Sequence, residues 1–465
     1  MGREVTVLVA LVVVYVIIAS QVESSQDVLA KIFWKTATAR PPMLIVFAVA
    51  GWGVVVEVAR RVGMRVELVI GPASPLPLWT QVRSAVGLLD GILALRLVPF
   101  VAEATGRRVA TWSLACDVAA HALCLGVLLY PPSRLFVASE NLAPERAAAH
   151  RKYAHTLAFE TAHARDSLAS TIWDSFLAPF APVTFWHVLV ADYATSMAKA
   201  LGDAHVTACV ALNTLADSYS RPPHHSAWWE ERRGPCASSV LNASAIALPF
   251  WCRLFQCCAV YRKTREPKNL WNAAKYATAF PLVYAGYLQK QPGGGSRAFF
   301  VLAAICQSSA TFAWDVLMDW GVFDRKKGGA LCGAFDPSKT RDSLVFSRAA
   351  TVNAYALLIL FDFALRFVWT LAVFGNAPTR GAGMFAFELV ELLRRTVWAL
   401  FRIEWEYVVH DHPIARQVER IDDEEDKGDD DDDDDDDTKA LLEEEIAKQK
   451  ELDVLGDDGP RLTSV

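Results

Sequence analysis

The sequence predicts an all-α, polytopic membrane protein with about nine or ten transmembrane helices. Hydrophobic residues make up 53% of the 465 residues, which is more than an ordinary soluble domain carries. Fifteen tryptophans accompany them. Apolar stretches long enough to cross a hydrocarbon core of ~30 Å recur along the chain, and they set the expected number of helices.

The apolar stretches comprise one N-terminal run and a series of longer ranges. Residues 5–19 form the N-terminal run, which we interpret as a first span or signal anchor. The polar, alanine-rich segment 135–176 has a helical pattern and suits either an interfacial helix or a polar-faced span. The remaining candidate spans are 42–62, 79–102, 111–130, 184–212, 240–260, 270–289, 298–322, 346–374 and 384–408.

Charge is distributed very unevenly along the chain. From Glu419 onward there are 22 acidic and 6 basic residues, a local charge of −16. The remainder carries 40 basic and 30 acidic residues, or +10. The aspartate run of the tail repels itself, so we expect disorder there. We divide the chain into an N-terminal span (1–35), N-terminal helices with a polar connection (36–183), a transmembrane core (184–412) and an acidic, disordered cytosolic tail (413–465).

The short loops indicate an orientation. Residues 261–269 and 323–328 are both short and basic, and the positive-inside rule places such loops in the cytosol. The C-terminus follows two spans later and is therefore also expected in the cytosol. The loop 217–239 then falls on the opposite side of the membrane.

The sequence shows little sign of catalytic or cofactor chemistry. The nine cysteines include no CxxC pair and lie mostly in apolar runs, so we interpret them as small buried hydrophobes rather than metal or disulfide partners. We find no catalytic serine or cysteine motif, no phosphate-cradling glycine loop and no nucleic-acid module. The protein is predicted not to be an enzyme, with no catalytic residue, metal or cofactor and no nucleic-acid partner.

Polar and charged side chains nevertheless interrupt six of the apolar ranges. Such residues are expensive inside a membrane and raise the expectation of a functional site. They are His187, Asp192 and Ser196; Arg253 and Gln256; Asn272, Lys275 and Tyr276; Asp315 and Asp319; Asp362, Arg366 and Trp369; and Glu391, Arg394, Arg395, Trp398 and Arg402.

The cations among them outnumber the acids at the positions expected to be most buried. If these helices converge, the surplus of arginine needs a counter-anion, and the planar guanidinium suits phosphate or carboxylate oxygens. This favours a small tetrahedral oxyanion as ligand. The alternative is that the charges form mutually satisfied pairs that fix helix register, such as Asp362 with Arg366. Trp369 and Trp398 suit either apolar gates or plain packing.

Taken in order, these motifs resemble the EXS family, which includes the SPX–EXS phosphate exporters and shorter Golgi proteins without an SPX domain. The resemblance covers about half of the chain, and we expect this chain to be closer to the SPX-less group. The matching segments are ADYATSMAKALGD (191–203), PFWCRLFQC (249–257), NAAKYATAFP (272–281), WDVLMDWGVFD (314–324), LRFVWT (365–370) and ELLRRTVWALFRIEWE (391–406).

The resemblance implies an all-helical, channel-like transporter of inorganic phosphate in the Golgi or another endomembrane. Its partners would be phosphate and the lipid bilayer, with a homodimer as a further option. The implied gating positions are Glu391, Trp369 and Trp398. The implied phosphate-binding positions are Asp192, Arg253, Lys275, Tyr276, Asp315, Arg366, Arg394 and Arg395.

Two other functions are compatible with the sequence. A membrane scaffold that sorts Golgi and ER proteins would use the cytosolic loops and the acidic tail, and it would not need the intramembrane charges. An enzyme acting on a lipid head group is the weaker alternative, because no nucleophile or metal motif is recognisable.

Overall fold

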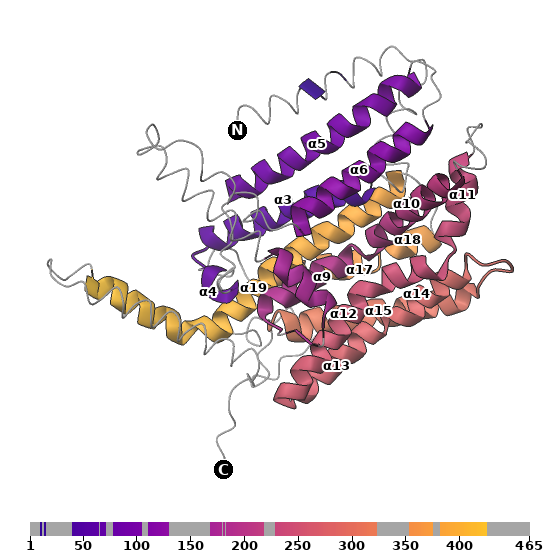
Figure 1. The fold of residues 1–465 in the computed structure, drawn as a ribbon. Coiled ribbons are helices and arrows are strands. Elements are labelled where there is room, and N and C mark those ends of the chain that lie inside the picture. Colours follow the sequence, from indigo (N-terminus) through magenta and orange to yellow (C-terminus); the bar gives the residue numbers. More distant parts are fainter. Residues whose placement is uncertain are drawn as a thin grey trace, which may run out of the picture.

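The computed structural model confirms the all-α class, because helix is the only regular secondary structure in the part of the chain that it describes. α19 (Ala382–Glu425) runs through the middle of the assembly and contacts helices from both halves of the chain (Figure 1). The described residues are 10–11, 14, 40–64, 66–70, 78–104, 110–129, 168–178, 180–181, 183–217, 228–322, 353–374 and 382–425.

Three long N-terminal helices pack on one side of α19. They are α3 (Arg40–Arg61), α5 (Leu78–Ala104) and α6 (Ala110–Leu129), and α3 contacts both α5 and α19. The short α4 (Val66–Ile70) packs against α19 near the end of α3. Figure 1 shows the three long helices as one group beside the yellow α19.

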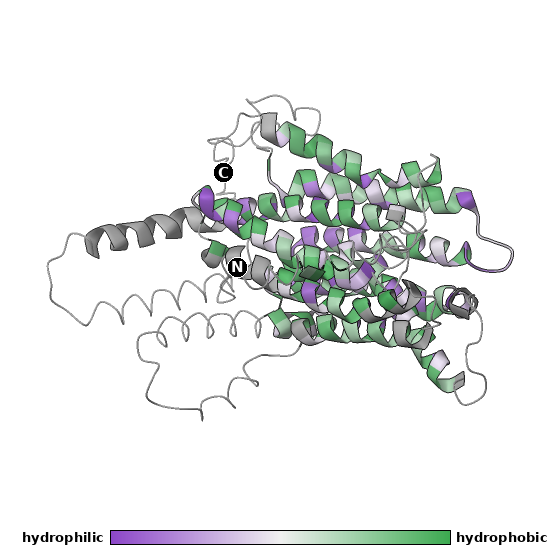
Figure 2. Cartoon of the chain, turned by 90° about the horizontal axis from the view of Figure 1, so that it is seen from above, coloured by the Kyte–Doolittle hydropathy of each residue, from purple (hydrophilic) through white to green (hydrophobic). Residues whose placement is uncertain are grey.

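The later helices pack on the other side. α12 contacts α9, α10, α13 and α14, so it is the centre of this group. Figure 2 shows mainly hydrophobic ribbon over this bundle, with hydrophilic positions lying within it. The elements are α9 (Phe185–Ser196), α10 (Ala198–Asp217), α11 (Trp228–Ala237), α12 (Val240–Thr264), α13 (Pro267–Ala277), α14 (Ala279–Leu288), α15 (Arg297–Trp314), the π-helix η2 (Asp315–Asp319), α17 (Asn353–Arg366) and α18 (Trp369–Val373).

Four of the predicted spans are broken or distorted in their interior. α9 gives way to α10 at Met197, and α13 gives way to α14 at Thr278. α15 widens into η2 at Asp315, and a turn at residues 367–368 separates α17 from α18. Broken helices and π-bulges free backbone groups inside a membrane, and they occur preferentially where a functional site is built. Each break lies close to a polar residue singled out in the sequence.

The expected number of spans is only partly supported. Every one of the nine candidate ranges contains described helix, but four helices are long and apolar enough to cross a membrane: Arg40–Arg61, Arg233–Thr264, Arg297–Asp319 and Tyr355–Val373. Internal charges and breaks make the other ranges shorter or less apolar, so the total of nine or ten remains a prediction. The N-terminal run, apart from residues 10–11 and 14, and segment 135–167 lie outside the described residues.

The far end of α19 differs from the predicted division of the chain. The helix continues to Glu425, past the boundary placed at residue 412. Its apolar part anchors the main hydrophobic core, in which Trp398, Ala399 and Ile403 pack with Val55 of α3 and Leu189 of α9. α19 thus holds the two groups of helices together at the level where its charged residues lie.

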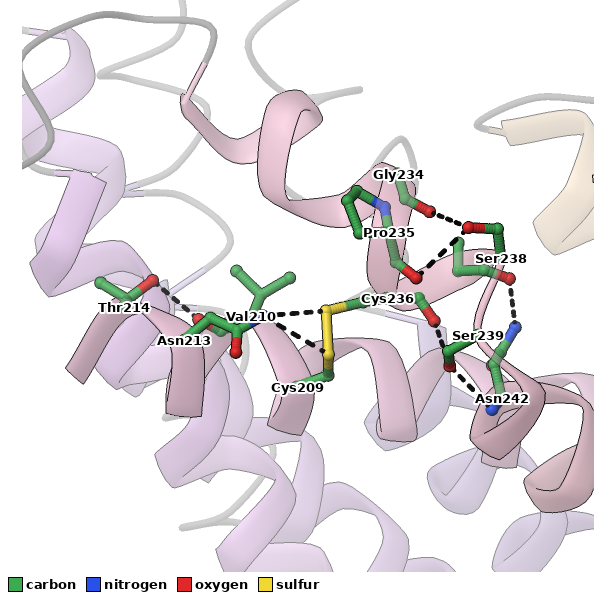
Figure 3. The surroundings of a disulfide bond; sticks show 11 residues. Cys209, Val210, Asn213, Thr214, Gly234, Pro235, Cys236, Ser238, Ser239 and Asn242 are labelled. Atoms are coloured by element: carbon green, nitrogen blue, oxygen red, sulfur yellow. Dashed lines mark hydrogen bonds between the residues drawn. A yellow bond between two sulfur atoms is a disulfide. The ribbon is translucent and has the colours of Figure 1, made fainter. Parts of the chain in front are cut away.

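A disulfide bond corrects the interpretation of two cysteines. Cys209 in α10 is bonded to Cys236 in α11, with their Cα atoms 5.9 Å apart (Figure 3). Asn213 Nδ2 lies 3.7 Å from the sulfur of Cys209 and 3.6 Å from that of Cys236. The prediction of plain buried hydrophobes is therefore wrong for this pair, which spacing alone did not reveal because 27 residues separate the two positions.

Candidate anion-binding site

A buried triad from three helices forms the first part of the site. Asp192 of α9 accepts hydrogen bonds at Oδ1 from Arg253 Nε of α12 (2.8 Å) and from the Tyr276 hydroxyl of α13 (2.7 Å). Arg253 Nε also donates to the Tyr276 oxygen at 3.1 Å. All three side chains are buried, and Gln256 accepts from Arg253 Nη1 at 2.7 Å. These bonds fix a guanidinium and a carboxylate in one orientation.

Lys275 lies beside this triad without a close carboxylate partner. Its Nζ sits 4.2 Å from the ring centroid of Tyr276 and 5.1 Å from that of Trp314. No Asp or Glu oxygen among the described residues comes within 4 Å of it. Cation–π contacts of this kind contribute about 0.5–2 kcal/mol, far less than the cost of removing an ammonium group from water. Lys275 is therefore a buried cation that is only partly compensated.

Arg395 is the second cation of this kind. It is buried, and its guanidinium donates only to neutral hydroxyls, at 2.9 Å to Ser196 and at 3.4 Å to Thr195. The Arg395 guanidinium carbon lies 4.3 Å from the ring centroid of Trp398, one turn further along α19. Within the described part of the chain, no carboxylate lies within 4 Å of Arg395. We call Lys275 and Arg395 the open group.

The neighbouring arginines have the opposite surroundings. Arg394 makes a two-pronged contact with Glu391, with Nε to Oε2 at 2.8 Å and Nη2 to Oε1 at 2.7 Å. Its Nη1 donates to Asp362 at 3.0 Å and lies 3.6 Å from Asp315. Arg366 bonds to Asp315 and lies 3.7 Å from Asp362. We call Arg366, Arg394, Asp315, Asp362 and Glu391 the paired group; it draws on α17, η2 and α19.

The three predicted gating residues have different positions. Glu391 accepts from the Ser196 hydroxyl at 2.7 Å, so one serine joins Glu391 to Arg395. Trp398 is buried under Arg395 and donates its indole N–H to Asp319 at 3.2 Å. Trp369 instead donates to Ser308 of α15 at 3.0 Å, and its described polar contact does not reach the charged groups.

The site is nearly neutral as a whole, which corrects the expected surplus of arginine. Arg402 is paired with Glu406 at 2.5 Å and lies 3.9 Å from Asp319, so it is not free to receive an anion. The six cations of the site, four of them buried and Arg366 and Arg402 partly buried, are matched by six acids once Asp362 and Glu406 are included. The excess positive charge is therefore confined to the open group. The paired group contains three acids and two arginines.

Several buried charges lie outside the predicted site. Arg96 of α5 pairs with Asp117 of α6 at 2.6 Å, and Arg40 of α3 pairs with Asp203 of α10 at 2.6 Å. Arg40 also lies 3.7 Å from Glu388. All five lie in or at the edge of apolar ranges, and that position is the signal by which the sequence could have revealed them. Arg96 and Asp117 join two N-terminal helices to each other, whereas Arg40 connects α3 to α10 and α19. The sequence motifs had predicted a site built by the later helices alone.

Comparison with known proteins places the site in a family context. Residues 36–408 match the sequence pattern described as the EXS family. "Solute carrier family 53 member 1" of Homo sapiens is 30% identical over 258 residues, covering 52% of this chain and 35% of the relative. A Danio rerio protein, "Xenotropic and polytropic retrovirus receptor 1 homolog", is 30% identical over 243 residues, covering 50% of this chain and 33% of its own length.

A third relative is more distant. "SPX and EXS domain-containing protein 1" of Dictyostelium discoideum is 26% identical over 264 residues, which cover 52% of this chain and 25% of the relative. The matched region thus spans about a third or less of each of these relatives' own length. It covers about half of this chain, whereas the EXS family pattern extends over most of it.

Proposed function

The chain belongs to the EXS family of integral membrane proteins, and we propose that it carries inorganic phosphate across a membrane along a path between its helices. The observation that carries this proposal is the open group. Lys275 and Arg395 are both buried, and both lack a carboxylate within 4 Å among the described residues. An anion between them would supply the missing countercharge.

The chemistry around the open group suits phosphate better than a fully ionised anion. Phosphate near neutral pH keeps at least one P–OH, which donates a hydrogen bond, while its other oxygens accept. Arg395 and Lys275 supply donors, and Asp192 supplies a carboxylate acceptor in the neighbouring triad. A sulfate ion has no hydrogen to donate to a carboxylate, so the acids of the site would select for the protonated oxyanion.

The phosphate ion would first occupy a position beside the open group. At this position we assign phosphate contacts to Asp192, Arg253, Lys275, Tyr276 and Arg395. Asp315, Arg366 and Arg394 would contact phosphate at a second position, after the paired group rearranges. Glu391 lies between the two, because it accepts from Ser196 on one side and from Arg394 on the other. When Glu391 is released from Arg394, the guanidinium of Arg394 would become available to bind the anion. This release is the gating role that we propose for Glu391. Trp398 would support Arg395, and Trp369 would gate from α18.

The disulfide supports an orientation for the protein. Disulfides persist in the secretory pathway and outside the cell, and they are rare in the cytosol. Cys236 lies within the loop 217–239 and Cys209 lies eight residues before it. The basic loops 261–269 and 323–328 favour a non-cytosolic position for the loop 217–239. Both observations favour a cytosolic C-terminus. We propose the Golgi or another endomembrane as the location, on the basis of the sequence motifs.

Phosphate flux into proteoliposomes tests the function. The purified full chain should raise phosphate uptake above that of empty vesicles, and the double variant Lys275→Ala, Arg395→Ala should abolish the increase. Arg61→Ala serves as a control, because Arg61 is an exposed arginine paired with Glu57 on α3. Normal flux in the double variant would overturn the mechanism, and a protein without flux that still sorts Golgi residents would favour the scaffold function.

Orientation needs a separate measurement. In sealed microsomes, a membrane-impermeant maleimide should label Cys209 and Cys236 only after reduction and only when the lumen is opened. A C-terminal tag should be digested by external protease in intact vesicles. Protection of that tag would contradict the proposed orientation, and fluorescence from the same tag in cells would identify the membrane.

A further inference from the structure

A second buried cluster of charges lies next to the proposed phosphate site, where α3, α10 and α19 meet. Arg40 Nη2 contacts Asp203 Oδ2 at 2.6 Å, and Lys199 Nζ contacts Asp203 Oδ1 at 2.7 Å. Arg40 Nη1 lies 3.7 Å from Glu388 Oε1. Arg40, Asp203 and Glu388 are buried, whereas the side chain of Lys199 is 40% exposed.

The two acids of this cluster differ in how close their cations lie. Asp203 has two close cations, one on each oxygen. Glu388 is 7% exposed, and within the described part of the chain neither of its carboxylate oxygens has a hydrogen-bond donor. The 3.7 Å contact with Arg40 is too long for a hydrogen bond. A carboxylate buried in this way gains stability by taking up a proton, which removes its charge.

Glu388 is also placed to sense an anion in the site. It precedes Glu391 by three residues on α19, so the two acids lie on adjacent turns of one face. Glu391 bonds both to Arg394 and to Ser196, which in turn accepts from Arg395. Asp203 and Lys199 lie on α10, which begins two residues after Ser196. Glu388 therefore shares α19 with cations of the phosphate site, and through Arg40 and Asp203 it is linked to the helix that follows Ser196.

We propose that Glu388 is a proton-binding site whose occupancy is coupled to phosphate binding; this inference rests on the proposed function. The charged groups that act on Glu388 are Arg40 of α3 and Asp203 and Lys199 of α10. Glu391, Arg394 and Arg395 follow Glu388 by three, six and seven residues on α19 itself. Asp192 of α9, Asp362 of α17 and the acids of η2 are held by cations of the site, and Glu57 of α3 is paired with Arg61.

The sign of the coupling follows from charge alone. Adding an anion beside Arg394 and Arg395 makes a negative charge on Glu388 less favourable, so phosphate binding drives proton uptake at Glu388. By linkage, a protonated Glu388 binds phosphate more tightly than an ionised one. Phosphate affinity should therefore rise as pH falls through the range in which Glu388 takes up its proton, and phosphate would cross with an accompanying proton.

Calorimetry on the full chain in nanodiscs can separate this proton from those of phosphate itself. Phosphate is titrated into the protein at one pH in two buffers of different ionisation enthalpy, and the difference in heat gives the number of protons taken up. The same measurement on Glu388→Gln retains the contribution of phosphate and removes that of Glu388. The wild type should take up more protons per phosphate than Glu388→Gln. At pH 8, Glu388→Gln should also bind phosphate about fivefold or more tightly than the wild type.

Equal proton uptake in the wild type and Glu388→Gln would overturn the proposal. Glu57→Gln, which changes a glutamate of the surface ion pair with Arg61, is the matched control and should behave as the wild type. If Glu388→Gln does not fold, infrared difference spectra of the wild type provide the test. Phosphate should then induce a carboxylic-acid C=O band in the protein, and its absence would overturn the idea. A wild type that binds no phosphate would instead refute the proposed function itself.

Discussion

The open group and the paired group are neighbours on α19, yet their charges are neutralised in different ways. Arg394 and Arg395 are adjacent in sequence, and both are buried. Arg394 contacts three carboxylates, whereas Arg395 contacts two hydroxyls and the face of Trp398. Adjacent residues on a helix point about 100° apart, so each arginine meets a different set of helices.

This difference separates stability from transport. A buried arginine surrounded by carboxylates holds its helices in register, and its removal leaves uncompensated negative charge. A buried cation without such a partner contributes little to holding the fold together and leaves room for a mobile anion. The paired group is thus expected to govern stability in the resting state, and the open group is expected to govern phosphate binding.

The largest effect is expected from Arg394→Ala. The change removes the ion-pair partner of Glu391 and leaves Arg366 as the described cation within 4 Å of Asp362 and Asp315. Losing one partner of a buried ion pair typically costs about 3–5 kcal/mol. The variant should show a markedly lower melting temperature in detergent, measured by fluorescence. Glu391→Gln, Arg394→Met removes both partners of the closest pair and should recover part of the loss. Wild-type thermal stability in Arg394→Ala would break the distinction between the two groups.

The second prediction concerns Arg395→Ala. The phosphate flux should fall about a hundredfold, equivalent to about 2.7 kcal/mol of lost interaction. The melting temperature should change far less than in Arg394→Ala, because no carboxylate is left without its partner. Arg395→Lys should retain partial flux, since it keeps the charge and loses the planar fork. A variant that unfolds while its residual folded fraction transports normally would show that Arg395 belongs with the paired group.

The sequence alone predicted the helices and most of the charged residues, because ionisable groups inside apolar stretches stand out. It could not distinguish Arg394 from Arg395. Their partners on α9, α17 and η2 lie between 32 and 200 residues away along the chain. The spacing of residues along α19 therefore does not predict these contacts. The predicted pair of Asp362 with Arg366 is present at 3.7 Å, but both residues make closer contacts across helices.

Other features were missed for similar reasons. The disulfide joins residues separated by 27 positions, without a motif that marks them. The helix break at Met197 occurs without a proline or glycine nearby, so tertiary packing rather than local propensity decides it. The break at Thr278 has a local cause, because Pro281 cannot bond to the carbonyl of Ala277, where α13 ends. The lack of hydrogen-bond donors to Glu388 depends on how α3 and α10 pack against α19, so the sequence does not predict it.

The third prediction extends the comparison to the other open cation. Lys275→Met should lower phosphate flux about tenfold or more, because it removes a charge that lies over aromatic rings and has no carboxylate within 4 Å among the described residues. The melting temperature should stay the same or rise, since a buried ammonium that is only partly compensated is costly to the fold. Lys263→Met is a matched control at an exposed lysine in the last turn of α12 and should change neither quantity. A strong loss of stability in Lys275→Met would show that the lysine is structurally paired.

The smallest effect is expected from Tyr276→Phe, which sharpens the boundary of the open group. The change removes the 2.7 Å hydrogen bond to Asp192, while the 2.8 Å contact between Arg253 and Asp192 can remain. It also keeps the ring on which Lys275 lies. The loss of one such bond costs about 0.5–1.5 kcal/mol, so flux should fall about tenfold at most. Tyr284→Phe, at a largely exposed tyrosine, is the control. A loss as large as that of Arg395→Ala would mean that the Tyr276 hydroxyl is as important for phosphate binding as the open group, whereas an unchanged flux would contradict the phosphate contact assigned to Tyr276.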